Sequence, residues 1–327
     1  MISYIIRRLG HMVVIFFLAS LICFAIIQLP PNDIITRRMQ ELAALGATNV
    51  ESTIATLKKI YNLDSPLIVQ YAIWVSGFVR GDFGYSLSYE VEVRELIFRR
   101  LSPTFLIILS SLFFAYLIAI VVGLYSATHQ YSLFDHIFTF LGMIGLGIPT
   151  FLLALLFLYI ASRFFGLSVG GLFSPSFVEA PWSLAKVYDL LKHVWGPVLI
   201  LAAYYAAGLI RIVRTRTLDT LREQHVMVAR SKGLSERTII SKHVFRLAVN
   251  PLISIMGLQL AEVVSGGIMV AIVLNLPTIG PLLLGALQTQ DMYLGGAILM
   301  LLIIMLLVGN FLVDIVLAWI DPRIRYD

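Results

Sequence analysis

Two acidic residues, Glu262 and Asp314, lie within long apolar stretches of the sequence. An ionisable side chain inside a membrane is costly and usually faces a bundle interior or a water-filled cavity, so each residue is a functional-site hypothesis. Glu262 either faces a path for a polar solute or forms a buried pair with a sister subunit. For Asp314, nearer the membrane boundary, we expect an interface or packing role, and a role in the path is the alternative. The candidates for a translocation path are Gln259, Glu262, Ser265 and Gly266.

The other residues that could do chemistry form no recognisable reaction centre in the sequence. The six His are scattered and give neither an i, i+4 metal-binding pair nor a His-Glu-x-x-His zinc motif. None of the six Lys follows a Gly, so the sequence holds no Gly-x-x-x-x-Gly-Lys-[Ser/Thr] phosphate loop. An intramembrane enzyme would need convergent His, Asp, Glu, Ser or Cys residues, and Cys23 has no such neighbours. We therefore expect no catalytic residue, metal site or cofactor site in this chain.

The glycines at 142, 145 and 147 resemble part of a nucleotide-binding fingerprint. The last glycine position of that motif is Thr150, however, and no strand precedes it. We expect close helix packing there instead, with Pro149 kinking the span.

The composition determines the kind of fold that must hold these residues. Hydrophobic residues make up 59% of the 327, charged residues only 13%, and the mean hydropathy is +0.90. A soluble domain carries about 25% charged residues. Twenty Phe, fourteen Tyr and a single Cys exclude disorder, a collagen-like fibre and a disulfide scaffold. The sequence predicts an all-α integral membrane protein, and the net charge of +5 fits retained cytoplasmic bases better than nucleic-acid binding.

Six apolar stretches are long enough to cross about 30 Å of hydrocarbon as helices. They run over His11–Leu29, Pro103–Thr128, Ile137–Ala161, Val194–Ile210, Leu252–Leu274 and Tyr293–Trp319. The first is longer than a signal-peptide core and lacks a small-x-small cleavage site, so we interpret it as a retained anchor.

The charges of the loops predict the orientation. With six spans both termini share one side, and the loops on that side carry thirteen Lys and Arg against three in the shorter loops opposite. Basic residues stay in the cytoplasm, so both termini are predicted to be cytoplasmic. The segment 30–102 is extracytoplasmic on this prediction, and is either a solvated cap or a contact site for a delivered ligand or partner.

The cytoplasmic segment Arg211–Asn250 is basic and patterned. Leu218–Lys232 contains no Pro or Gly and suits one helix, and Ser235 is a plausible N-cap for a second helix that runs to about Leu247. On that second helix Ile239, Ile240, His243 and Leu247 share a face that could dock into a groove on a partner. The alternative is an ordinary positive-inside loop.

The segment Val228–Ser235 resembles the cytoplasmic coupling loop of the permeases of dipeptide- and oligopeptide-type ABC importers, in a diverged form of their EAA motif. The resemblance covers essentially the whole chain. Other matches, in the family's order, are Tyr4–Leu9, Gly81–Ser86, Arg100–Thr104, Ile148–Phe151, Gly257–Leu260, Pro277–Gly280 and Asp321–Tyr326.

This resemblance implies a type I ABC importer permease fold in a prokaryotic inner membrane. It also implies three kinds of partner besides membrane lipid: a second, homologous permease, two cytoplasmic ATPase subunits that bind ATP and Mg²⁺, and an extracytoplasmic binding protein. The implied domains are 1–29 with the first helix, an enlarged extracytoplasmic segment 30–102, a core 103–320 and a cytoplasmic tail 321–327. The implied coupling-loop residues are Val228, Ala229, Arg230, Lys232, Gly233, Leu234, Ser235, His243, Arg246 and Pro251.

The chain departs from the family pattern at several positions. The Glu-Ala-Ala triplet is replaced by Met227–Ala229, Leu247 occupies a position that is often Asn, and Ala271 replaces an acidic residue late in the fifth span. Glu262 lies mid-span, where relatives usually have small residues.

The sequence leaves one alternative for the transported solute and one for the energy source of transport. The resemblance favours di- or oligopeptides, whereas the long segment 30–102 is similar to that of relatives associated with oligosaccharides. An ion-coupled secondary transporter is the alternative of a different class, although it would normally show inverted repeats and several intramembrane charges.

Overall fold

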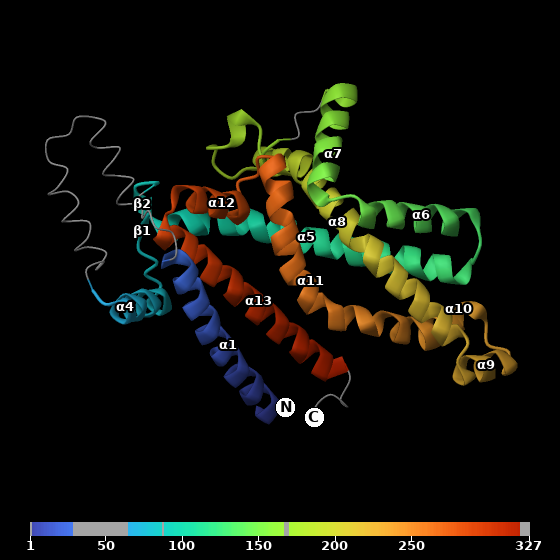
Figure 1. The fold of residues 1–327 in the computed structure, drawn as a ribbon. Helices are drawn as coiled ribbons and strands as arrows, with labels where there is room; N and C mark the ends of the chain where they lie inside the picture. The colour runs from blue at the N-terminus through green and yellow to red at the C-terminus, as the bar shows by residue number, and fades with distance from the viewer. Residues whose placement is uncertain (1, 29–64, 87, 167–169, 321–327) are drawn as a thin grey trace, which may run out of the picture. The chain divides into compact units, whose positions relative to one another are not determined.

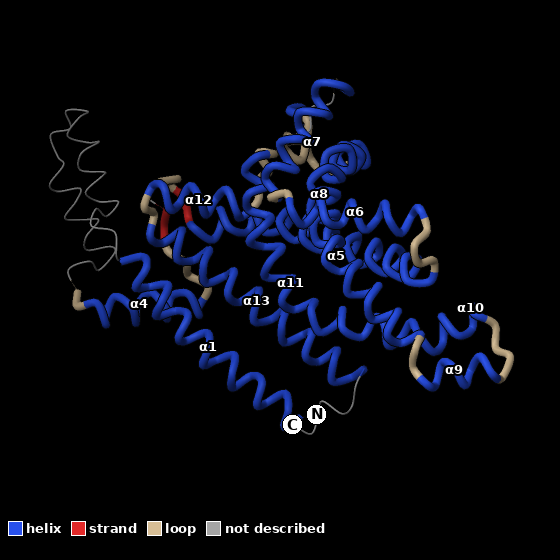
Figure 2. Tube along the Cα trace, turned by 45° about the vertical axis from the view of Figure 1, so that its right-hand side comes forward, coloured by secondary structure: helices blue, strands red, loops and turns tan. Residues whose placement is uncertain are grey.

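The computed structural model describes residues 2–28, 65–86, 88–166 and 170–320, and these are almost entirely helical (Figure 1). The longer helices are α1 (Ile2–Gln28), α4 (Leu67–Arg80), α5 (Val93–Thr128), α6 (Leu133–Gly147), α7 (Thr150–Phe165), α8 (Leu184–Leu221), α9 (Gln224–Ser231), α11 (Phe245–Val273), α12 (Ile279–Thr289) and α13 (Met292–Ile320). Shorter turns are η1 (Pro175–Phe177), α10 (Glu236–Thr238) and the π-helix η2 (Ile239–Val244). Two short strands, β1 (Tyr85–Ser86) and β2 (Val91–Glu92), form one antiparallel hairpin, drawn red in Figure 2.

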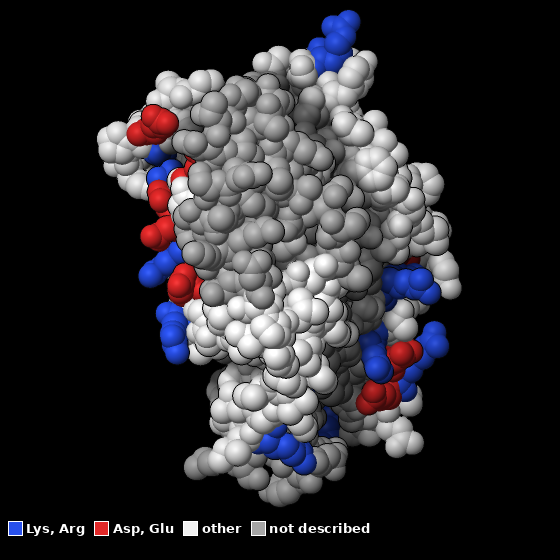
Figure 3. All heavy atoms as spheres, turned by 60° about the vertical axis from the view of Figure 1, so that its left-hand side comes forward, with Lys and Arg blue, Asp and Glu red and all other residues white. Residues whose placement is uncertain are grey.

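Within the described residues, five helices are long and apolar enough to cross a membrane, or six if the bent pair α6–α7 counts as one span. Together with the composition, this makes the chain a multi-pass membrane protein. Among the described residues drawn in Figure 3, Lys, Arg, Asp and Glu side chains lie in separate groups toward the edges of the view, and most of the described surface is uncharged. Such a surface suits contact with lipid.

Several helices are longer than the predicted spans. Helix α5 begins at Val93 rather than Pro103, and α8 extends from Leu184 to Leu221 rather than from Val194 to Ile210. A hydropathy window marks only the apolar part of a helix, whereas charged residues such as Arg99 continue the helix without breaking it. The apolar stretches were therefore located correctly, but the helices were predicted too short.

The chain bends at Pro149 as predicted, but the bend is a break between two helices and not a kink within one. Helices α6 and α7 meet at an angle of 110°, and the break falls at Ile148 and Pro149. Ile148 has extended backbone angles, as expected of a residue that precedes proline. The extended residue stops α6 before proline starts α7, so the apolar stretch forms two helices.

The chain divides into two compact units, Met1–Ser102 with Pro281–Val308 and Pro103–Gly280 with Gly309–Asp327. In the first unit α1 packs on α4. The hydroxyls of Ser20 and Tyr71 lie 2.7 Å apart. The Phe24 and Tyr71 rings pack edge-on, with their centroids 5.5 Å apart. The predicted helical stretch Val50–Tyr61 of the extracytoplasmic segment lies outside the described residues.

The buried carboxylate of Asp291 ties the hairpin of the first unit to the start of α13. It accepts hydrogen bonds from the Ser86 hydroxyl at 2.6 Å, the Ser88 N–H at 3.2 Å and the Leu294 N–H at 3.1 Å. The last of these bonds caps α13.

We predict that Asp291→Ala lowers the free energy of unfolding by about 2 kcal/mol, because a lost cap costs about 1 kcal/mol and a buried unpaired donor at least as much. The change is measured by SDS titration in mixed micelles. Asp82→Ala is the control, since the exposed Asp82 carboxylate accepts one bond, from the Gly84 N–H. Equal losses in the two variants would contradict the prediction.

The core of the second unit is built by α5, α7, α8 and α11. Its fully buried members include Ala115, Ala154, Leu201, Leu209 and Leu252. Small residues let the helices approach closely: a Cβ added at Gly123 in α5 would lie 2.6 Å from the Val213 Cβ in α8. This core holds the end of α8 from which the patterned basic loop departs.

Candidate functional site

The basic loop begins where α8 ends. The N–H groups of Arg222 and Glu223 bond back only three residues, to Asp219 and Thr220, and the chain then turns into α9. The single helix predicted over Leu218–Lys232 is therefore two helices. No Pro or Gly marks this break, which explains why the sequence pattern missed it.

A left-handed residue reverses the chain between α9 and α10. Gly233 has φ +76°, its N–H donates to the Arg230 carbonyl at 2.9 Å, and the Leu234 N–H donates to the Ala229 carbonyl at 3.3 Å. Gly233 thus forms a tight reversal between the two helices, where a residue without a Cβ adopts the left-handed conformation at no steric cost. Ser235 caps α10 as predicted, because its hydroxyl accepts from the Thr238 N–H.

The loop has a small apolar core of its own. Its members are Val226, Ala229, Ile239 and Val244, all buried, with Leu221 packed against them. The hypothesis that Ile239 helps to form a docking face is therefore wrong, because its side chain is 0% exposed. The helical period placed Ile239 on an apolar face, but its side chain packs within the chain beside Ala229 of α9, whereas Leu247 of the same face is 44% exposed.

A different set of apolar side chains is exposed. Met227 is 52% exposed, Val228 53% and Leu234 40%, and we call these three residues the α9 patch. Lys232 is exposed beside it in sequence. An exposed apolar patch next to basic residues on a rigid turn can bind a complementary groove, but it offers no group for catalysis.

The side chain of Arg230 forms an ion pair that links the two sides of the Gly233 reversal. Its Nε donates to Glu236 Oε1 at 2.7 Å and its Nη2 donates to Oε2 at 3.2 Å. These hydrogen bonds raise the pKa of the Arg230 guanidinium, which stays charged. Both side chains are well exposed, so the pair orients the turn more than it stabilises the fold.

The remaining predicted loop residues lie further along. The His243 ring is half-buried, 6.4 Å from the His225 ring, while Arg246 is exposed near the start of α11. Pro251 lies within α11. These three residues are not part of the α9 patch.

The predicted path residues are only partly described. Gln259 is buried in α11, and its Oε1 has no hydrogen-bond partner among the described residues. Glu262, Ser265 and Gly266 belong to the same helix, but their side chains lie outside the described part of the structure.

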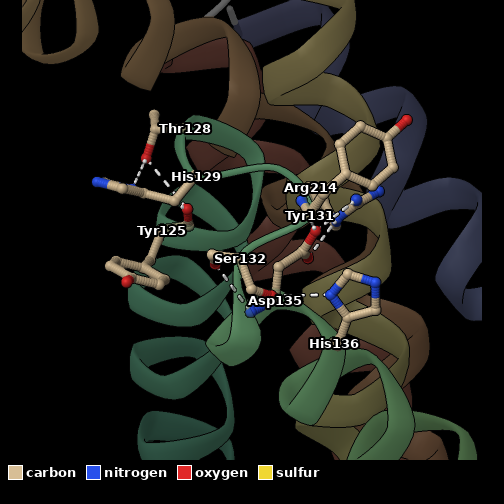
Figure 4. A network of polar contacts seen from close by, with 8 residues as sticks. All are labelled: Tyr125, Thr128, His129, Tyr131, Ser132, Asp135, His136 and Arg214. Carbon is tan, nitrogen blue, oxygen red and sulfur yellow. Dashed lines mark hydrogen bonds and ion pairs between the residues drawn. The ribbon is translucent and has the colours of Figure 1, made fainter.

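Two functional candidates were missed by the sequence interpretation. The carboxylate of Asp135, at the start of α6, accepts two hydrogen bonds from Arg214 of α8 (Figure 4). The available signal was Ser132-x-x-Asp135, which resembles a capping box. Ser132 indeed accepts from the Asp135 N–H at 3.2 Å.

Within the described ranges, no group of three or more His, Cys, Asp or Glu side chains is placed to hold a metal ion.

Comparison with known proteins adds two family matches. Residues 119–326 match the model of the binding-protein-dependent transport system inner membrane component, and residues 1–108 match the model of the N-terminal part of such membrane components.

Curated relatives align along the full length. The oligopeptide transport system permease protein AppB of Bacillus subtilis is 33% identical over 328 residues, which cover 100% of both chains. A Brucella suis protein whose name describes a peptide permease is also 33% identical, over 99% of both chains. The glutathione transport system permease protein GsiC of Escherichia coli K12 is 29% identical over 100% of both.

Proposed function

Because this chain belongs to the family of binding-protein-dependent transport system inner membrane components, we propose that it is the transmembrane permease subunit of an ATP-driven importer of di- or oligopeptides. Full-length relatives named as oligopeptide, peptide and glutathione permeases support this cargo over oligosaccharides. An extracytoplasmic binding protein delivers the peptide.

The proposed complex holds a second, homologous permease and two cytoplasmic ATPase subunits. The lack of a phosphate loop in the sequence supports this division of labour. ATP and Mg²⁺ bind the partner ATPases, and this chain contributes no catalytic residue. The proposed topology has six spans, with 30–102 outside and both termini in the cytoplasm of a prokaryotic cell. Its support is the excess of basic residues in the loops assigned to the cytoplasm.

The observation that carries the coupling role is the α9 patch. Met227 and Val228 are exposed on α9 and Leu234 is exposed just after the Gly233 reversal, while this reversal and the buried core beneath fix their positions. The α9 patch binds in a cleft of the ATPase. When the cleft closes, the loop moves with it and displaces α8 and α11, since both helices are continuous with the loop. The other coupling-loop residues position the α9 patch or supply charge around it.

We predict that Val228→Asp reduces the ATPase recovered with the tagged permease about fivefold. A carboxylate at a buried contact loses the apolar burial of valine and must be desolvated. The measurement is co-purification of the whole complex in mild detergent, with subunits quantified by mass spectrometry.

Ser241→Asp is the matched control, because it adds the same charge at an exposed position of η2 outside the patch. Its ATPase recovery should equal that of the wild type. If the wild-type chain purified as a stable homodimer with no ATPase, the importer proposal would fail and ion-driven transport around Glu262 would be tested next.

A further inference from the structure

The Asp135–Arg214 pair joins three elements of the second unit through one carboxylate (Figure 4). Arg214 Nε donates to Oδ1 at 3.0 Å and Nη2 donates to Oδ2 at 2.9 Å. The Tyr131 N–H donates to the same Oδ2 at 3.0 Å. The carboxylate therefore fixes the turn between α5 and α6 and binds α8 at once.

The burial and the geometry of the Asp135–Arg214 pair make it sensitive to the relative orientation of α6 and α8. The Asp135 side chain is 5% exposed and that of Arg214 29%. A bidentate guanidinium–carboxylate contact constrains the relative orientation of the two side chains as well as their distance, and shielding from water strengthens the contact. Tyr131 adopts φ +63°, an uncommon conformation for a non-glycine residue, and its N–H is one of those held by the carboxylate.

A second contact holds α6 against α8 further along. A Cβ added at Gly145 in α6 would lie 3.3 Å from the Ala207 Cβ in α8. Gly123 gives α5 a similar approach to Val213, the residue next to Arg214. The α5–α6 hairpin thus touches the same stretch of α8 by close packing and by a charge pair.

That stretch of α8 leads directly to the loop. Arg214 lies about two helical turns before Leu221, the last residue of α8. Leu221 packs against the buried core under α9. A displacement of α9 consequently reaches Arg214 through one short run of helix and a packed core.

We propose that Asp135 and Arg214 are positioning residues that make the α5–α6 turn and the end of α8 one rigid body, so that movement of the coupling loop is passed to α5 and α6. This inference rests on the proposed function. The close-packed glycines keep the helices in contact, and the charge pair prevents α6 from sliding or rotating along α8.

The test uses the whole importer in proteoliposomes with its binding protein, and peptide uptake and ATP hydrolysis are measured on the same vesicles. Arg214→Lys keeps the charge but lacks the two-pronged geometry. We expect the number of peptides imported per ATP hydrolysed to fall about fivefold, at an unchanged amount of assembled complex. Arg99→Lys is the control, because Arg99 forms an exposed ion pair with Glu95 at 2.6 Å. An unchanged ratio in Arg214→Lys would overturn the proposal.

A spin-label distance tests rigidity independently of uptake. Labels replace the exposed residues His136 of α6 and Arg216 of α8 in a Cys23→Ala background. In the assembled wild type we expect one narrow distance, identical with and without ATP, and a broadened one in Arg214→Lys. A wild-type distance that shifts on ATP binding would show that α6 and α8 move separately and would overturn the proposal.

The two readouts separate the failure of this inference from failure of the proposed function. If the wild-type vesicles showed no ATP-dependent peptide uptake, the proposed function would fail, while the label distances would still report whether the pair holds α6 to α8. If uptake were normal and both readouts were insensitive to Arg214→Lys, only the positioning role would fail.

Discussion

Gly233→Val is expected to lower peptide uptake per ATP hydrolysed at least about tenfold, while membrane insertion stays intact. The cause is the backbone, because φ is +76° at this residue and no atom lies within 4 Å of an added Cβ. A non-glycine residue in this conformation costs about 1–2 kcal/mol, and a β-branched one more. Since about 1.4 kcal/mol is a factor of ten in population, the reversal that presents Val228 and Leu234 becomes at least about tenfold less populated relative to other conformations of the loop.

Gly233→Asn provides the matched control. Asparagine tolerates the left-handed conformation far better than valine, so uptake should stay close to that of the wild type. Uptake and ATP hydrolysis are measured in proteoliposomes, and insertion is measured by the amount of chain in the membrane fraction. Normal uptake by Gly233→Val would refute the assignment of this segment as the coupling loop.

Gly123→Val should produce the largest loss of stability. Its Cβ would lie 2.6 Å from the Val213 Cβ and 3.1 Å from the Ile210 carbonyl oxygen, which belongs to the α8 backbone and cannot rotate away. Overpacking usually costs about 1–3 kcal/mol, and two further methyl groups at a backbone contact bring the expected loss to at least about 3 kcal/mol. SDS titration in mixed micelles measures the change.

The control for Gly123 is Gly10→Ala in α1, where an added Cβ meets no atom within 4 Å. Alanine there removes backbone freedom from the unfolded chain and should leave stability equal or slightly higher. Retention of wild-type stability by Gly123→Val would mean that α5 and α8 are not packed as closely as described.

The spans show which parts of this fold can be predicted from sequence. A run of about 20 apolar residues has few alternatives to a membrane helix, so the positions of α1, α5, α8, α11 and α13 follow from composition. The ends of α5 and α8 do not, because helix propensity continues past the last apolar residue. The angle at Pro149 depends on what α6 and α7 pack against, and a local sequence pattern does not contain that information.

In the coupling loop, too, the features set by local sequence were predictable and those set by packing were not. Gly233 and Ser235 were predictable because a left-handed reversal and an N-cap are local requirements that few residue types meet. The burial of Ile239 was not, since an apolar face has the same period whether it covers its own chain or a partner. Asp135 and Arg214 are 79 positions apart, and only the packing of α6 on α8 makes them a pair.

The break between α6 and α7 also bears on how the chain is made. With 15 and 16 residues, these helices are about 22 and 24 Å long, each shorter than the ~30 Å hydrocarbon layer. Their tertiary supports are synthesised later, because Gly145 rests on Ala207 and the Phe157 ring lies against Gly196, both in α8. The segment therefore enters the membrane before the surfaces that define its bend exist. We therefore expect the 110° bend between α6 and α7 to reach its final geometry only after α8 has left the ribosome.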